Sequence, residues 1–280
     1  NAGFDILGRV MPGGSVIPYQ SNPYVLAVIS LLIISGGLGF LVWQDLSAYH
    51  RTHHLRTHTK LVLWITGWLL LLGTAGILFM EYNNPLTLGP MNLFDKITNA
   101  AFQSVSARTA GYNSIPLGDM TNFTKIFMSL LMFIGAAPGS TGGGVKVTTI
   151  AVVILTIRSV AQGRDDCVIH DHHIESKTIY RALTIIMLGA VAALGSAVVV
   201  YYNSAEAVTV IDAIFESCSA FGTVGLSVGV TGQLNTGAKL LYMLVMFMGR
   251  VGPVSLAISL TAKPDDNKRK VMPVGHINVG

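Results

Sequence analysis

Long runs of apolar residues divide this chain into candidate membrane spans. Three runs of about 20 residues carry no charged side chain, and a fourth carries a single arginine. A helix rises ~1.5 Å per residue, so about 20 residues cross a hydrocarbon core of ~30 Å. The pattern therefore predicts membrane-spanning helices over residues 24–43, 61–80, 182–202 and 240–260.

A fifth apolar region, residues 126–157, is too long for one span and is interrupted near its centre. As one helix it would reach ~48 Å. Residues 133–149 read FIGAAPGSTGGGVKVTT, a composition that predicts two half-helices joined by irregular backbone. Lipid does not tolerate exposed backbone polar groups, so this loop must face protein or a water-filled cavity. A helix broken at membrane depth favours a transport pathway.

Two shorter apolar stretches, residues 93–105 and 210–220, reach less than ~20 Å and cannot cross a membrane. Each is either a surface amphipathic helix or a re-entrant helix, and an internal repeat favours the second interpretation. Residues 102–111 read FQSVSARTAG and residues 215–225 read FESCSAFGTVG, while a truncated third copy, NAGFD, opens the chain. The repeating unit is therefore a helix, a short re-entrant helix, a glycine loop and a second helix.

Composition supports an integral membrane protein and charge predicts its orientation. The chain has 280 residues, 51% hydrophobic and 11% charged, against about 25% charged in soluble domains, and its mean hydropathy is +0.57. Lys and Arg gather in the connections 44–60 and 158–181 and in the tail after residue 262, with Arg9, Lys96 and Lys125 as exceptions on the other side. Cytoplasmic loops are enriched in these residues, so the basic loops and the C-terminus are predicted to be cytoplasmic.

The two cysteines and the first residue add two expectations. Cys167 is expected in a cytosolic loop and Cys218 in a short buried helix, so no disulfide framework is predicted. The chain lacks an initiator Met and a signal peptide and begins within a glycine loop, so we expect it to be the C-terminal part of a longer protein.

The loop motifs, in this order and spacing, resemble the Trk/Ktr/HKT superfamily of potassium transporters, most of all the membrane subunit of the bacterial Ktr system. The matching segments are NAGFD, SARTAGYN, SAFGTVGLS, GAAPGSTGGGVK and MFMGRVGP, which together cover the chain. The resemblance implies an all-α membrane protein whose helix–re-entrant pore loop–helix units surround one ion pore in a pseudo-fourfold arrangement. The first unit and part of the second would be absent here. The implied divisions are 1–46 (end of the second repeat), 60–160 (third repeat), 177–262 (fourth repeat) and 263–280 (cytosolic tail).

In such a protein the glycine loops would form the selectivity filter. A dehydrated K⁺ needs oxygens in place of its water shell, and backbone carbonyls supply them. Glycine permits the backbone angles that turn carbonyls toward an axis, and the negative ends of the re-entrant helices favour a cation. One such loop alone is usually an ordinary turn, but three at equivalent positions favour a filter. The implied filter residues are Asn1, Ala2 and Gly3, then Thr109, Ala110 and Gly111, then Thr223, Val224 and Gly225. A preference for K⁺ over Na⁺ follows from the resemblance alone.

The interrupted segment would form a gate below this filter. Glycine and small hydroxyl residues permit alternative backbone paths, and the expected gate residues are Gly135, Pro138, Gly139, Ser140, Thr141, Gly142, Gly143, Gly144 and Lys146, together with Arg250. The alternative, a nucleotide-binding loop, needs G-x-x-x-x-G-K-[ST] after a strand, which this segment does not match. Arg250 is a second intramembrane cation, which either snorkels or faces the cavity or a partner. We expect Lys146 and Arg250 to form an electrostatic barrier.

Histidines cluster in both basic loops. His50, His53, His54 and His58 lie in one, and His170, His172 and His173 lie in the other. Solvated polar loops are the favoured interpretation, with metal binding or pH sensing as the alternative. No transition-metal site is predicted. The same loops are candidates for docking a cytosolic partner. The resemblance implies an RCK/KTN-type ring that binds ATP and ADP, since the chain has no G-x-G-x-x-G motif of its own. It also implies a homodimer and no nucleic acid.

The resulting prediction is the pore-forming subunit of a regulated potassium uptake system in the bacterial inner membrane. Flux would be passive, through a carbonyl-lined filter, with assistance by Na⁺ left open. The chain shows no catalytic dyad or triad and is predicted not to be an enzyme or to carry a cofactor of its own. The alternatives are a Trk-type or Na⁺-permeable relative, a non-conducting fragment of such a transporter, and a membrane enzyme that binds phosphate with the glycine-rich loop.

Overall fold

The computed structural model describes Gly3 and residues 14–163, 168–169, 172–204, 208–252 and 255. This part of the chain is helical apart from two two-residue strands, β1 (Val168–Ile169) and β2 (His172–His173), which pair antiparallel. The helices are η2 (Ile17–Tyr19), α1 (Pro23–Leu38), α2 (Phe40–Thr52), α3 (Thr57–Glu81), α4 (Leu93–Ser106), α5 (Asn122–Phe133), α6 (Val147–Ala161), α7 (Ser176–Asn203), α8 (Val210–Phe221), α9 (Val230–Gln233) and α10 (Thr236–Val251). The predicted tail, residues 263–280, lies outside the described residues.

Two described helices, α3 with 25 residues and α7 with 28, are long and apolar enough to cross a membrane unaided. They contain the predicted spans 61–80 and 182–202. The prediction of one straight span over residues 24–43 is wrong, because α1 and α2 meet at an angle of 95°. Gly39 forms the corner with a φ of 84°, and a Cβ there would lie 2.5 Å from the carbonyl oxygen of Pro138. The bend therefore depends on a loop that is distant in sequence.

The interrupted segment has the predicted form. α5 ends at Phe133 and α6 begins at Val147, and the backbone between them is irregular. The two short apolar stretches are helices as well, α4 with 14 residues and α8 with 12. The described part of the last predicted span, α10, ends at Val251. Its predicted continuation to residue 260 lies outside the described residues except for Gly252 and Ser255.

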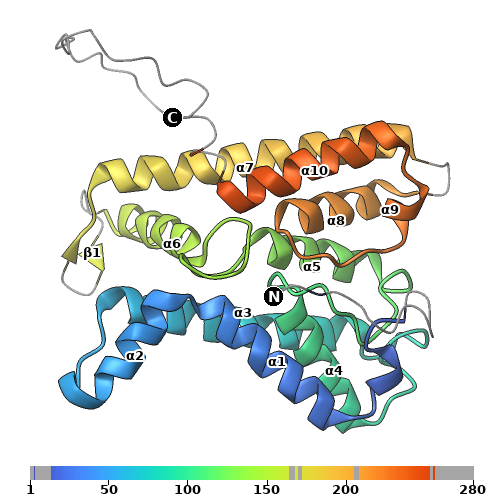
Figure 1. Cartoon of the computed structure of the whole chain (residues 1–280), viewed down its shortest axis with the longest axis horizontal. Helices are drawn as coiled ribbons and strands as arrows, with labels where there is room; N and C mark the ends of the chain where they lie inside the picture. Colours follow the sequence, from blue (N-terminus) through green and yellow to red (C-terminus); the bar gives the residue numbers. More distant parts are fainter. Residues whose placement is uncertain are drawn as a thin grey trace, which may run out of the picture.

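The packing repeats around the two short helices. α4 packs against α3 of its own repeat and α1 of the preceding one, and α8 packs in the same way against α7 and α5, and also against α10. The long helices come close to the short ones at glycines. A Cβ on Gly73 would lie 2.2 Å from Ser104 Oγ, and one on Gly189 would lie 2.8 Å from the ring of Phe221. Figure 1 shows α1 to α4 on one side and α6, α7, α8 and α10 on the other, with the loop after α5 between them.

The short helices point their C-terminal ends at the glycine loops. Their N-termini are capped by side chains: Asn92 accepts from the backbone N–H of Asp95 at 2.8 Å, and Thr209 forms a capping box with Asp212. Their C-termini run directly into residues 107–111 and 222–225, which leaves the negative end of each helix dipole beside a glycine loop.

Candidate functional site

The two complete glycine loops share one backbone conformation. Thr109 and Thr223 have φ values of 68° and 52°, and the glycines two positions later, Gly111 and Gly225, have φ values of 87° and 95°. A threonine with positive φ is strained, because its branched side chain crowds the backbone. The same strain at the same position of both repeats indicates that the surrounding structure imposes this conformation.

The three predicted filter glycines lie next to one another. A Cβ on Gly3 would lie 2.0 Å from the carbonyl oxygen of Ala110, and a Cβ on Gly111 would lie 2.5 Å from that of Val224. Gly111 and Gly225 are also neighbours, since a Cβ on Gly225 would lie 3.5 Å from Gly111 Cα. The carbonyl oxygen of Ala110 therefore faces Gly3, and that of Val224 faces Gly111. The space between each carbonyl and its glycine is too small for a side chain. Asn1 and Ala2 lie outside the described residues.

Polar residues at the second and fifth positions of the repeated motif hold the glycine loops. Ser106 Oγ donates to the carbonyl oxygen of Tyr112, and Ser219 Oγ accepts from the backbone N–H of Gly225 at 3.2 Å. Glu216 accepts from the backbone N–H groups of Val228 and Val230, both at 3.1 Å, and from two hydroxyls.

In the other repeat, Gln103 accepts from the backbone N–H of Ser114 at 3.5 Å, at the position equivalent to Glu216. All four polar side chains, those of Gln103, Ser106, Glu216 and Ser219, are buried. The repeat was recognised from the sequence, but no role was predicted for these four residues. The signal was the F-[QE]-S-x-S-A pattern itself, which keeps polar residues in buried short helices.

Backbone hydrogen bonds hold the predicted gate loop, residues 134–146, on both sides. On the α1–α2 side, Ala137 N–H donates to Gly37 O at 3.1 Å, and Phe40 N–H donates to Gly139 O at 3.1 Å. On the α10 side, Gly144 N–H donates to Gly249 O at 3.1 Å. This irregular backbone is therefore satisfied by protein groups, as membrane depth requires.

The gate loop also touches both glycine loops. A Cβ on Gly142 would lie 2.4 Å from Thr109 Oγ1, and a Cβ on Gly143 would lie 2.3 Å from Thr223 Oγ1. The two consecutive glycines thus each meet one of the strained threonines. The structure brings the described part of the predicted filter and the predicted gate together at one place between the two halves of the molecule.

Both predicted gate cations bind carbonyl oxygens of the loop. Lys146 Nζ donates to Gly142 O at 2.6 Å, and the Arg250 guanidinium donates to Thr141 O. Lys146 is half-buried, while Arg250 is exposed in the last turn of α10. Two positive charges therefore bind adjacent stretches of the same loop.

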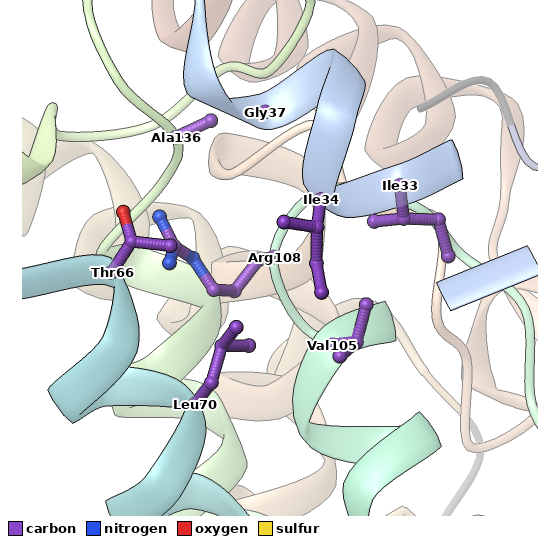
Figure 2. A pocket seen from close by; sticks show the side chains of 8 residues that line it. All are labelled: Ile33, Ile34, Gly37, Thr66, Leu70, Val105, Arg108 and Ala136. Atoms are coloured by element: carbon purple, nitrogen blue, oxygen red, sulfur yellow. The ribbon is translucent and has the colours of Figure 1, made fainter. Parts of the chain in front are cut away.

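A third cation, Arg108, lies behind the glycine loop of its own repeat. Its side chain is buried, with 7% exposure, and its guanidinium donates to Gly135 O at 3.4 Å. Figure 2 shows this side chain extending between Thr66 and Ala136 in a small cavity of about 10 Å³. Arg108 therefore connects the turn before Gly111 to Gly135, near the start of the gate loop. No role was predicted for Arg108 from the sequence, although a charge within an apolar motif was the available signal.

Two alternatives raised by the sequence can be compared with the structure: a nucleotide-binding loop and a metal site. The glycine-rich loop follows α5 rather than a strand, unlike a nucleotide-binding P-loop. Within the described ranges, no group of three or more His, Cys, Asp or Glu side chains could hold a metal ion. Cys218 is a buried free thiol, while His170 and Cys167 lie outside the described residues.

Fold and site together define a multi-pass helical membrane protein with neighbouring glycine loops and a broken helix beside them. A family model described as cation transport protein, TrkH, matches residues 1–270. The chain therefore belongs to the TrkH family of cation transport proteins. This membership agrees with the predicted superfamily and with the prediction that the chain is not an enzyme.

Relatives and a solved structure support this assignment. The Ktr system potassium uptake protein B of Bacillus subtilis is 35% identical over 287 residues, covering 100% of this chain and 61% of the relative. The potassium/sodium uptake protein NtpJ of Enterococcus hirae is 36% identical over 267 residues, covering 94% and 57%.

The crystal structure of the potassium transporter TrkH from Vibrio parahaemolyticus has the same fold, with a TM-score of 0.69 and 18% identity. The match covers 88% of this chain and 54% of that one. This chain thus spans little more than half the length of the proteins that it matches.

Proposed function

We propose that this chain forms the larger part of a potassium pathway in a bacterial uptake transporter of the inner membrane, with its basic loops and C-terminus in the cytoplasm. The observation that carries the proposal is the row of glycine loops, in which the carbonyl of Ala110 faces Gly3 and the carbonyl of Val224 faces Gly111. Closely spaced carbonyls without fixed charge can replace the hydration shell of K⁺. Two helix C-termini that end at these loops favour a cation there.

The gate proposal concerns residues 134–146. Gly142 and Gly143 contact the threonines of the two glycine loops, so the loop lies where an ion leaving the filter would pass. Lys146 and Arg250 add positive charge at the same place. This loop blocks the pathway at rest, and transport requires it to move.

Two partners belong to this proposal. The Bacillus relative is named as a protein of a Ktr system, which supports a cytosolic nucleotide-binding ring as regulator, with ATP or ADP bound by that ring. A homodimer, with contacts through the C-terminal tail, is the second expected assembly.

Potassium-dependent growth of an uptake-deficient bacterium tests the filter. The variant Gly111→Ala places a methyl group 2.5 Å from Val224 O at a φ of 87°, a strain of ~1–3 kcal/mol. We expect uptake of K⁺ to fall at least about tenfold in the complete transporter. The matched control is Gly67→Ala on α3, where a Cβ meets no atom within 4 Å. Growth of Gly111→Ala equal to wild type would contradict the proposal.

A sodium-permeable transporter is the second candidate, because the Enterococcus relative is named as a potassium/sodium uptake protein. Competition between K⁺ and Na⁺ in vesicle flux assays separates the two. Flux of the 280-residue chain alone, compared with a longer form that supplies the part matched only in the relatives, tests the fragment alternative.

A further inference from the structure

An apolar groove of about 640 Å³ lies between α3 and α6. Its walls are aliphatic side chains and two tryptophans, Trp64 and Trp68, and the only charged lining residue is Lys60. None of its lining residues belongs to the glycine loops.

The groove has the length of one bilayer leaflet. Along α3 its lining extends from Lys60 to Leu72, a rise of ~18 Å, against ~15 Å for half of the hydrocarbon core. The groove volume of about 640 Å³, divided by this length of ~18 Å, gives a mean cross-sectional area of about 36 Å². A helix of ~10–12 Å diameter does not fit, whereas a single hydrocarbon chain does.

The charged end of the groove is at Lys60, and Trp64 follows one turn further along α3. Lys60 is exposed, and neither of the two ion pairs found among the described residues includes it. The rings of Trp64 and Trp68 are in edge contact, with centroids 5.8 Å apart. In the part of the chain that the structure describes, their indole N–H groups have no assigned acceptor, whereas Trp43 donates to Ser35 O at 2.9 Å. Tryptophan and lysine in this arrangement are typical of the headgroup level of a membrane.

We propose that this groove binds one acyl chain of an anionic phospholipid, whose phosphate pairs with Lys60. The apolar walls bury the chain, and Lys60, with Trp64 one turn further along α3, selects the headgroup end. Lys60 is one of the basic-loop residues, so the lipid belongs to the leaflet on that side. Binding itself does not depend on the proposed cation pathway.

The inner end of the groove reaches the predicted gate. Ile134 lines the groove, pairs with Val145 in an isolated backbone bridge and precedes Gly135. A bound acyl chain would therefore pack against the root of the gate loop and restrict its movement. This consequence, unlike the binding, rests on the proposed function.

A neighbouring groove provides an internal control. It lies between α6 and α7, has about 410 Å³, and is lined by Ile157, Val160 and Leu183 among others but by no basic residue or tryptophan. The proposal predicts that this second groove does not select an anionic headgroup.

Native mass spectrometry of the purified protein with phosphatidylglycerol or phosphatidylcholine tests the proposal without measuring flux. We expect one retained phosphatidylglycerol per chain, preferred about tenfold over phosphatidylcholine. Lys60→Gln should abolish the preference, and Ile154→Trp, which fills the groove, should abolish retention. The matched controls Lys177→Gln, an exposed lysine on α7, and Leu183→Trp in the second groove should retain the lipid. Circular dichroism verifies that each variant is folded.

Three outcomes would overturn the proposal. The first is equal retention of both lipids by the wild-type protein. The second is wild-type retention by both Lys60→Gln and Ile154→Trp. The third is a change of oligomeric state in Ile154→Trp without any loss of lipid, which would assign the groove to a second copy of the chain.

Discussion

In the proposed mechanism, two basic side chains bound to one loop decide whether a cation can pass. Arg250 donates to Thr141 O and Lys146 donates to Gly142 O, so both charges lie directly beside the glycines that touch the filter threonines. Like charges repel one another and a passing cation at short range. Their hydrogen bonds to the loop nevertheless hold it in place, so removing one should loosen the gate.

We expect Arg250→Gln to raise potassium flux severalfold in the absence of the regulator. The variant removes both the charge and the donor to Thr141 O. Lys239→Gln, a change of an exposed lysine on the same helix, is the control and should leave the flux as it is. The measurement is potassium flux in reconstituted vesicles. An unchanged flux in Arg250→Gln would refute the proposed electrostatic barrier.

At the scale of elements, an ion pair between buried Lys125 and partly buried Asp212 joins the two repeats in the described part of the chain. Lys125 of α5 and Asp212 of α8 are 2.7 Å apart, with side-chain exposures of 9% and 15%. Asp212 also accepts from Thr209 in the capping box of α8. The pair therefore fixes the start of α8, and with it the direction of the helix that leads into the glycine loop of Thr223 and Gly225.

Breaking this pair should cost ~3–5 kcal/mol, because it leaves a buried charge without a partner. We expect Asp212→Asn to lower the unfolding temperature in detergent at neutral pH. The double variant Lys125→Met with Asp212→Leu should regain much of the loss, since it leaves no buried charge. Equal unfolding temperatures for Asp212→Asn and wild type would show that the pair does not stabilise the fold.

The same pair predicts a pH dependence. Burial alone would raise the pKa of the Asp212 carboxyl, but the hydrogen bonds from Lys125 and Thr209 and the charge of Lys125 outweigh burial and lower this pKa. The stabilisation is therefore present above the unfolded value of ~3.9 and is lost as pH falls through the lower folded pKa. The difference in unfolding temperature between wild type and Asp212→Asn should shrink in that acidic range. A difference that stays constant there would contradict the assignment.

At the scale of the whole molecule, the helices give the chain two distinct ends. The basic connections between α2 and α3 and between α6 and α7 lie at one end, and the capped N-termini of α4, α8 and α10 lie at the other (Figure 1). The excess of Lys and Arg in these connections supports the proposal that the first end is cytoplasmic.

Accessibility of single cysteines tests this orientation. In a background without Cys167 and Cys218, we expect Gln162→Cys to react with a membrane-impermeant thiol reagent only in inside-out vesicles, and Asn203→Cys only in right-side-out vesicles. Both positions are exposed, so neither fails to react through burial. The opposite pattern would invert the proposed topology, and labelling of both from one side would exclude α7 as a span.

Several structural features of this protein are determined by short segments of its sequence. The apolar runs determine α3 and α7, because 20 or more uncharged residues have no other low-energy environment than a membrane. The glycine-rich interruption determines the break between α5 and α6, and the repeated motif determines α4 and α8 with their glycine loops. Each of these features depends on composition or spacing within a single segment.

Only the tertiary structure decided what depends on contacts between distant segments. The 95° corner at Gly39 exists because the gate loop occupies the space beside it. Buried Arg108, Gln103 and Glu216 acquire their roles from carbonyls, N–H groups and hydroxyls supplied by other segments. The neighbouring positions of Gly3, Gly111 and Gly225 depend on helices packing across about 220 residues of chain. Periodicity reports which face of a segment is buried, whereas packing alone determines which partner covers it.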